Sequence, residues 1–138
     1  MKVFLDTCAL AALSSTEDDL HLAAKTVYAS LHRNSYQLYT SDYILDETYT
    51  LLAARRGHHK AVAFMDGFEG SGVELLRVDA RIESAAKTLF RKLDFESLSF
   101  TDCTSFALIN AHRIDHVFTF DKHFSFFRFN HPVVILGE

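Results

Sequence analysis

The chain has few of the residues that mark several specialised classes of protein. Among its 138 residues are two cysteines and one proline. Cys8 and Cys103 are too few for a disulfide scaffold and lack the spacing of a zinc knuckle. The single proline, Pro132, leaves no proline-rich linker, and no internal repeat is present. We therefore expect residues 1–138 to form a single domain, which is long enough to bury one sizeable core.

Long apolar runs are also missing. No stretch approaches the roughly 20 apolar residues that a membrane-spanning helix needs. Asp6 introduces a charge too early for the N-terminal segment to be a signal peptide. The hydrophobic fraction of 49% and the charged fraction of 23% are ordinary for soluble globular proteins. We expect a cytoplasmic protein that does not enter a membrane.

The chain has no excess of positive charge, because its formal net charge is −4. A protein that coats nucleic acid without selectivity would be basic overall. This argument is weak here, since four of the 18 acidic residues belong to a cluster described below, where bound cations would offset them. The basic residues fall mainly at 55–60 and 77–92, and solvated helix faces explain both groups best. Net charge alone identifies no partner.

Short apolar runs alternate with longer segments of helical period, a pattern typical of a parallel sheet with helical crossovers. Right-handed crossovers place helices on both faces of such a sheet. We therefore predict an α/β fold, a three-layer α/β/α sandwich with a mainly parallel central sheet of four to five strands. The expected strands are Val3–Asp6, Gln37–Thr40, Val73–Val78, His116–Phe120 and Val133–Leu136.

Five helices are expected between these strands, on the basis of apolar periodicity and terminal residues. The first helix would be capped by Ser15 or Thr16 and reach Leu31, and the second would run from a cap at Ser41 to Gly57. The third includes Ala61 to Phe68 and closes at Gly70. The fourth opens at Asp79, and the fifth would be capped by Thr101 and run from Asp102 to about Asn110.

Four acidic residues are expected at one edge of the sheet. Asp6 and Asp121 follow predicted strands, Asp102 lies at a helix start, and Glu47 lies one to two turns into another helix. In open α/β sheets the site lies at the carboxyl ends of the strands, and helix N-termini stabilise negative charge. Two like charges 4 Å apart still cost about 4 kcal/mol at an effective dielectric near 20. Each acid alone has an ordinary explanation as a cap or a solvated residue, but together they predict a divalent-metal site.

The residues around these acids resemble the four motifs of the PIN domain, the metal-dependent nuclease fold shared by the VapC-type toxins of toxin–antitoxin pairs. The resemblance covers essentially the whole chain, in the family's order. Cys8 departs from it, because the family often has Ser or Thr there. The four segments are Leu5–Leu10, Ile44–Thr48, Phe100–Ala107 and Phe118–Phe124.

The resemblance implies an endoribonuclease that uses Mg²⁺ or Mn²⁺, ions that prefer oxygen ligands. It also implies an RNA substrate, a small antitoxin that neutralises the protein, and a homodimer. Asp6, Glu47, Asp102 and Asp121 are assigned as the catalytic and metal-binding residues, with Glu47 or Asp121 acting through water. Thr7 and Thr119 are candidates for orienting a carboxylate or a metal-bound water.

Two other functions are alternatives to a ribonuclease. One is a catalytically silent PIN scaffold that binds RNA or protein, although all four acids are present. The other is a receiver-like domain with an acidic pocket, which is disfavoured because the first strand ends in one Asp followed by Thr7.

Cysteine, lysine and histidine residues in or near these motifs offer further candidates. Cys8 and Cys103 are expected at helix N-termini that would lower the pKa of a thiol, although small core residues are the simpler interpretation. Lys122 and His123 either contact a scissile phosphate or form a turn anchored by Phe124. His112 and His116 are expected to be packing or surface residues rather than a zinc pair.

Overall fold

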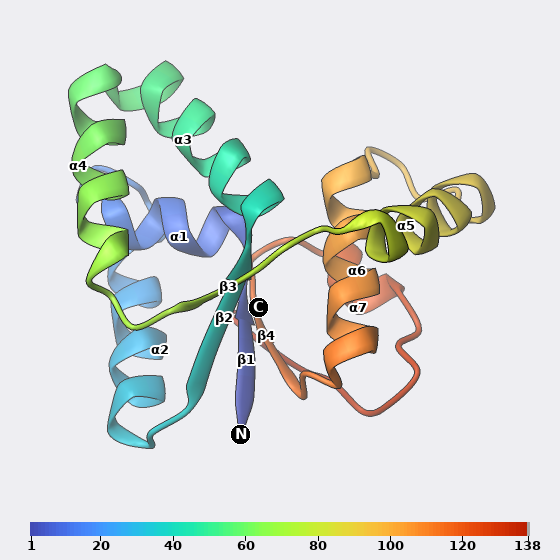
Figure 1. Cartoon of the computed structure of the whole chain (residues 1–138). Helices are drawn as coiled ribbons and strands as arrows, with labels where there is room; N and C mark the ends of the chain where they lie inside the picture. The colour runs from blue at the N-terminus through green and yellow to red at the C-terminus, as the bar shows by residue number, and fades with distance from the viewer. Residues whose placement is uncertain (138) are drawn as a thin grey trace.

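The computed structural model describes residues 1–137, in which five strands form one wholly parallel sheet of order β3-β2-β1-β4-β5 (Figure 1). This confirms the predicted α/β fold with a central sheet of four to five strands. The strands are β1 (Lys2–Leu5), β2 (Gln37–Ser41), β3 (Glu74–Leu76), β4 (His116–Phe118) and β5 (Val134–Leu136). Strands β3, β4 and β5 are shorter than predicted, whereas β1 is shifted by one residue and β2 is one residue longer.

Helices cover both faces of the sheet, as Figure 1 shows, so the three-layer arrangement is also confirmed. On one face lie α1 (Thr7–Ser14), α2 (His21–Arg33), α3 (Asp42–Arg56) and α4 (His58–Glu69). On the other lie α5 (Ala80–Lys92), α6 (Phe100–His112) and the short α7 (His123–Phe126). Within residues 1–137, no helix combines the length and the apolar character that crossing a bilayer requires.

Four of the predicted helix ends are confirmed, among them Gly70, which follows the last residue of α4. The Ser41 hydroxyl accepts a hydrogen bond from the Ile44 N–H at 3.1 Å, and the Asp79 carboxylate accepts one from the Ile82 N–H at 2.9 Å. Gly57 ends α3 with a φ of 97°, a conformation that favours glycine.

Other predicted helix ends were wrong. Ser99, not Thr101, caps α6. Helix α2 begins only at His21, after a cap position at Leu20, so neither Ser15 nor Thr16 caps it. Two observed helices, α1 and α7, were not among the predicted ranges. The helix start expected at Cys8 nevertheless implies α1.

Helix α6 lies at the centre of its layer, and every residue from Asp102 to Ile109 is buried. A helix that is apolar on all sides is stable only when its surroundings cover it. Part of this cover is aromatic: the Phe106 ring stacks on Phe127 with a centroid separation of 4.3 Å and meets Phe124 edge-on at 5.1 Å. The first turn of α6 is therefore a rigid platform for Asp102.

The strand order changes direction at β1, which pairs with β2 on one side and with β4 on the other. The connections therefore diverge at the carboxyl ends of β1 and β4, where open α/β folds place their ligands. Asp6 directly follows β1, and Thr119 directly follows β4. The topology alone brings these two distant segments to one edge.

Candidate metal centre

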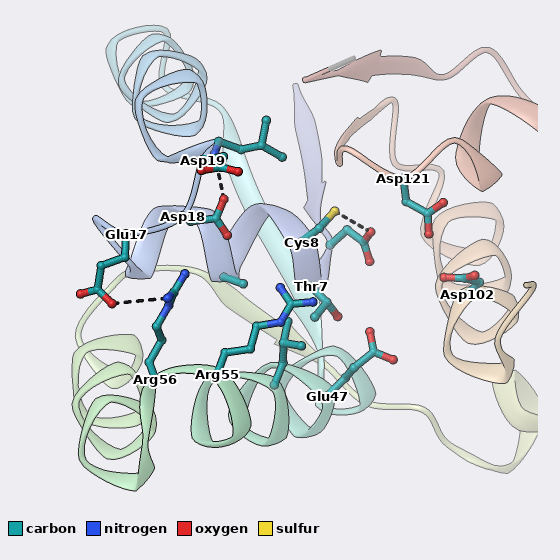
Figure 2. Close-up of a pocket in the computed structure, with 14 residues that line it drawn as sticks. Thr7, Cys8, Glu17, Asp18, Asp19, Glu47, Arg55, Arg56, Asp102 and Asp121 are labelled. Atoms are coloured by element: carbon teal, nitrogen blue, oxygen red, sulfur yellow. Dashed lines mark hydrogen bonds and ion pairs between the residues drawn. The ribbon is translucent and has the colours of Figure 1, made fainter.

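A pocket of about 650 Å³ opens at this edge of the sheet, and all four predicted acids line it (Figure 2). Figure 2 shows Asp102 and Asp121 on one side, with Glu47 facing them from α3. The far end of the pocket carries other charged side chains, from the α1–α2 loop and from the end of α3. These are Glu17, Asp18, Asp19, Arg55 and Arg56.

Asp6 is 4% exposed and precedes α1 as its N-cap residue. One carboxylate oxygen, Oδ2, accepts a hydrogen bond from the Thr119 hydroxyl at 2.8 Å and one from the Cys8 thiol at 3.4 Å. Burial raises the pKa of Asp6 to about 7, and the charge of Asp102 adds to the increase, although the hydrogen bond from Thr119 opposes it. Asp6 is thus a carboxylate held in place without a compensating cation.

The two predicted threonines have different surroundings. Thr119 Oγ1, fully buried, donates to Asp6 and accepts from the Asp121 N–H at 2.9 Å, so this hydroxyl connects the segments after β1 and β4. Thr7 lines the pocket, and its Oγ1 is buried with no hydrogen-bond partner among residues 1–137. Because buried polar groups are almost always paired, such an atom indicates a missing partner.

Asp102 is fixed by a reciprocal capping box at the start of α6. The Ser99 hydroxyl accepts from the Asp102 N–H at 3.0 Å, and Asp102 Oδ2 accepts from the Ser99 N–H at 3.2 Å. The side chain is largely buried, and burial raises the pKa of Asp102, as does the nearby charge of Asp121. The start of α6, as predicted for Asp102, therefore orients its carboxylate. Burial at this position makes the ionised form of that carboxylate unfavourable.

His123 is a member of the site that sequence reasoning left undecided. Its ring Nδ1 lies 3.1 Å from Asp102 Oδ2 and 3.1 Å from Asp121 Oδ1, and its Nε2 lies 2.6 Å from the Glu96 carbonyl oxygen. Ligand atoms of Asp102, Asp121 and His123 all fall within 4.8 Å of one another. The predicted turn is present as well, because Phe124 is buried and the His123 N–H donates to Asp121 Oδ1.

The pKa of His123 reflects opposing effects. Burial lowers it, but the Glu96 carbonyl and the charges of Asp121 and Asp102 outweigh burial and raise it. The raised pKa of His123 thus results from its contacts with Glu96 and with the two acids. The only sequence signal for this role was the position of His123, two residues after the acid that follows β4.

Comparison with known proteins places this geometry in a family. The sequence model of the PIN domain matches residues 3–130. The chain belongs to the PIN domain family. The predicted resemblance is thereby confirmed.

One relative, VapC20 of Mycobacterium tuberculosis, matches this chain in both sequence and structure. This PIN domain is 36% identical over 123 residues to the 23S rRNA-specific endonuclease VapC20 of Mycobacterium tuberculosis (strain CDC 1551 / Oshkosh), a match that covers 89% of this chain and 92% of the relative. It also superimposes with a TM-score of 0.82, at 35% identity and the same coverage, on the crystal structure of M. tuberculosis VapC20, described as a sarcin–ricin loop cleaving toxin.

A more distant structure shows the same fold. VapBC2 from Rickettsia felis, bound to a DNA fragment from its promoter, matches with a TM-score of 0.69 at 15% identity, covering 98% of this chain and 97% of the other.

The lowered thiol pKa expected for this PIN domain was wrong. Burial raises the pKa of Cys8 to about 12, with a further contribution from the charge of Asp6. Burial and the charge of Asp102 raise the pKa of Cys103 to about 11. Cys8 Sγ instead accepts a hydrogen bond from the Phe120 N–H at 3.1 Å, so this thiol helps to shape the edge of the pocket. For each thiol, burial and one nearby carboxylate outweigh the expected effect of the helix N-terminus.

The histidines considered as a zinc pair do not share a helix. His112 is the last residue of α6, whereas His116 lies in β4 with its ring against Asp115. They are packing and surface residues, as expected.

Proposed function

We propose that this PIN domain is a divalent-metal-dependent endoribonuclease that hydrolyses RNA phosphodiester bonds and acts as the toxin of a type II toxin–antitoxin pair. One observation carries the proposal: Asp6, Glu47, Asp102 and Asp121 line a single pocket at the switch point of the sheet. The named RNA endonuclease at 36% identity supports the choice of substrate class.

The pocket residues fit a hard divalent ion. Carboxylate and hydroxyl oxygens are the groups that Mg²⁺ and Mn²⁺ prefer, and the raised pKa values of Asp6 and Asp102 reflect negative charge that burial leaves uncompensated. We infer that Asp102 and Asp121 contact the ion most directly, because their oxygens lie in the compact group of ligand atoms. Asp6 and Glu47 would complete the site directly or through water. When bound, such an ion supplies an activated water and offsets charge on the leaving oxygen.

The chain's own residues would orient the reaction. The capping box holds Asp102 in one position, and the Thr119 hydroxyl fixes Asp6 relative to the backbone that carries Asp121. Glu47 is exposed on the opposite wall, where its carboxylate can accept a proton from a water. Arg55 reaches into the pocket from the end of α3 (Figure 2) and is placed to meet an RNA phosphate beside the scissile one.

Two partners follow from the proposed role. An apolar groove of about 650 Å³ between α1, α2 and α4, which includes Leu13, Tyr28, Phe64 and Phe68, would receive a segment of a small antitoxin. We further propose a single-domain cytoplasmic protein that forms a homodimer.

The two alternative functions have less support. A silent scaffold would not need four acids in one pocket together with a buried threonine hydroxyl that lacks a hydrogen-bond partner among residues 1–137. A receiver domain has the strand order 2-1-3-4-5, whereas the order here is 3-2-1-4-5.

The proposed function is tested by incubating the purified chain, free of any antitoxin, with defined RNAs that include ribosomal RNA. We expect cleavage in Mg²⁺ or Mn²⁺, no cleavage in EDTA, and recovery when the metal is returned. Cleavage that persists in EDTA would exclude the metal. If none of these RNAs is cleaved with either ion, the nuclease assignment fails.

Replacement of Thr119 by Val should weaken the site without removing a carboxylate. The variant loses the hydroxyl between Asp6 and the Asp121 N–H, so we expect metal affinity to fall by about tenfold, the range found when groups that orient ligands are removed. Isothermal titration with Mn²⁺ measures this. Thr104→Val is the matched control, because Thr104 is also buried and donates to a backbone carbonyl, at 2.7 Å. Equal losses in the two variants would contradict the role given to Thr119.

A further inference from the structure

Two contacts orient the His123 ring, and a third holds its backbone. Its Nε2 lies 2.6 Å from the Glu96 carbonyl oxygen, which can only accept a hydrogen bond, so Nε2 carries a proton. The ring also stacks on Phe95 with an interplanar angle of 13°. The backbone N–H of His123 donates to Asp121 Oδ1 at 2.9 Å. These contacts leave Nδ1 as the ring atom that faces the carboxylates of Asp102 and Asp121.

The same arrangement is typical of a histidine that binds a metal. Metal-ligating histidines usually donate their second ring N–H to a carbonyl or carboxylate, which fixes the tautomer and the ring orientation. Here Nδ1 lies 3.1 Å from one oxygen of Asp102 and 3.1 Å from one oxygen of Asp121, and all three atoms can face a single point. An ion bound between these atoms would take Nδ1 as a ligand together with one oxygen of each carboxylate.

A second observation, the unpaired hydroxyl of Thr7 among the described residues, also indicates that the pocket binds a ligand. Thr7 is 6% exposed and lines the pocket, yet its hydroxyl has no hydrogen-bond partner in the part of the chain that the structure describes. This hydroxyl comes from α1, on a different element from the His123 group. The two observations are therefore independent.

We propose that His123 supplies a nitrogen ligand, through Nδ1, to the divalent ion held by Asp102 and Asp121, so that the centre favours Mn²⁺ over Mg²⁺. The inference rests on the proposed metal site and goes beyond it, because an all-carboxylate centre contains only oxygen ligands. Both ions prefer oxygen, but Mn²⁺ accepts an imidazole nitrogen more readily than Mg²⁺, which demands near-ideal octahedral geometry and keeps several waters. The identity of this one side chain therefore sets the preference between the two ions.

The test measures Mn²⁺ binding to the wild type, to His123→Gln and to the control His59→Gln, which changes an exposed histidine of α4 outside the pocket. Isothermal titration gives the affinities for Mn²⁺ and Mg²⁺, and pulsed electron paramagnetic resonance detects nitrogen bound to Mn²⁺. We expect a nitrogen coupling in the wild type and in His59→Gln, and its loss in His123→Gln. Mn²⁺ affinity should fall by at least about tenfold in that variant, with a smaller change for Mg²⁺.

Labelling all histidines with ¹⁵N in the wild-type chain gives a measurement that does not depend on how well the variant folds. In the pulsed electron paramagnetic resonance spectrum of bound Mn²⁺, the ¹⁴N coupling should be replaced by a ¹⁵N coupling. If the wild type binds Mn²⁺ but the signal does not respond to this label, the inference is overturned and the proposed metal site stands. The assignment to His123 is also overturned if His123→Gln keeps the coupling. A wild type that binds neither ion overturns both the inference and the proposed metal site.

Discussion

Asp102→Asn is expected to lower RNA cleavage in Mg²⁺ or Mn²⁺ by at least about a hundredfold, because losing a ligand costs more than the 10- to 100-fold typical for groups that orient ligands. The substitution removes one negative charge and leaves an oxygen that can still accept from the Ser99 N–H. The free energy of unfolding without metal should therefore fall by no more than about 1 kcal/mol. Initial cleavage rates and urea denaturation measure the two effects.

Asp79→Asn is the matched control for this variant. Asp79 also lies at a helix start, where its carboxylate accepts from the Ile82 N–H at 2.9 Å, but it does not line the pocket. Asparagine is an equally good N-cap residue, so cleavage and stability should both be kept. Full activity in Asp102→Asn with purified protein and added Mg²⁺ would refute the assignment of Asp102.

Asp6→Asn is expected to abolish cleavage and, in the absence of metal, to make the protein more stable at pH 8. The pKa of Asp6 is about 7 in the folded protein against an ordinary value of 3.8. The folded state therefore holds the Asp6 proton more tightly than the unfolded state does. The resulting stabilisation is complete below pH 3.8 and is lost as the pH rises through about 7. Since one pKa unit corresponds to about 1.4 kcal/mol, the upper limit of this loss is about 4 kcal/mol.

Urea denaturation in EDTA measures the free energy of unfolding of the wild type and of Asp6→Asn at pH 5 and at pH 8. The difference between the two proteins, compared at the two pH values, separates the titration of Asp6 from that of other groups. The advantage of the variant should be smaller at pH 5 than at pH 8, because asparagine resembles the protonated carboxyl, which Asp6 keeps in the folded protein at pH 5. Added Mn²⁺ should stabilise the wild type more than the variant. A variant that is less stable than the wild type at pH 8 in EDTA would show that ionised Asp6 is not costly to bury.

Local signals explain which parts of the fold were predictable. Ser41, Asp79 and Gly57 act on backbone within three or four residues, so their roles can be read from neighbouring letters. The start of α6 was misplaced by two residues because Ser99 and Thr101 both carry a hydroxyl. The choice depends on Asp102, which closes the capping box with Ser99.

Features that depend on long-range packing were less predictable. Helices α1 and α7 have only eight and four residues, and such short helices form only when the rest of the protein covers them. The raised pKa of Cys8 depends on burial that the sequence does not display. The acids were located from strand and helix ends, but the contact between His123 and Asp102 spans 21 residues and appears only in three dimensions.

The pairing of β1 with β4 has a consequence for the timing of synthesis. Asp6, Glu47 and Asp102 are all made before β4, whereas the Thr119 hydroxyl that binds Asp6 lies 113 residues further along the chain. A growing polypeptide therefore carries three of the four acids without the pocket that joins them. The pocket can therefore assemble only after β4 and Thr119 have been synthesised.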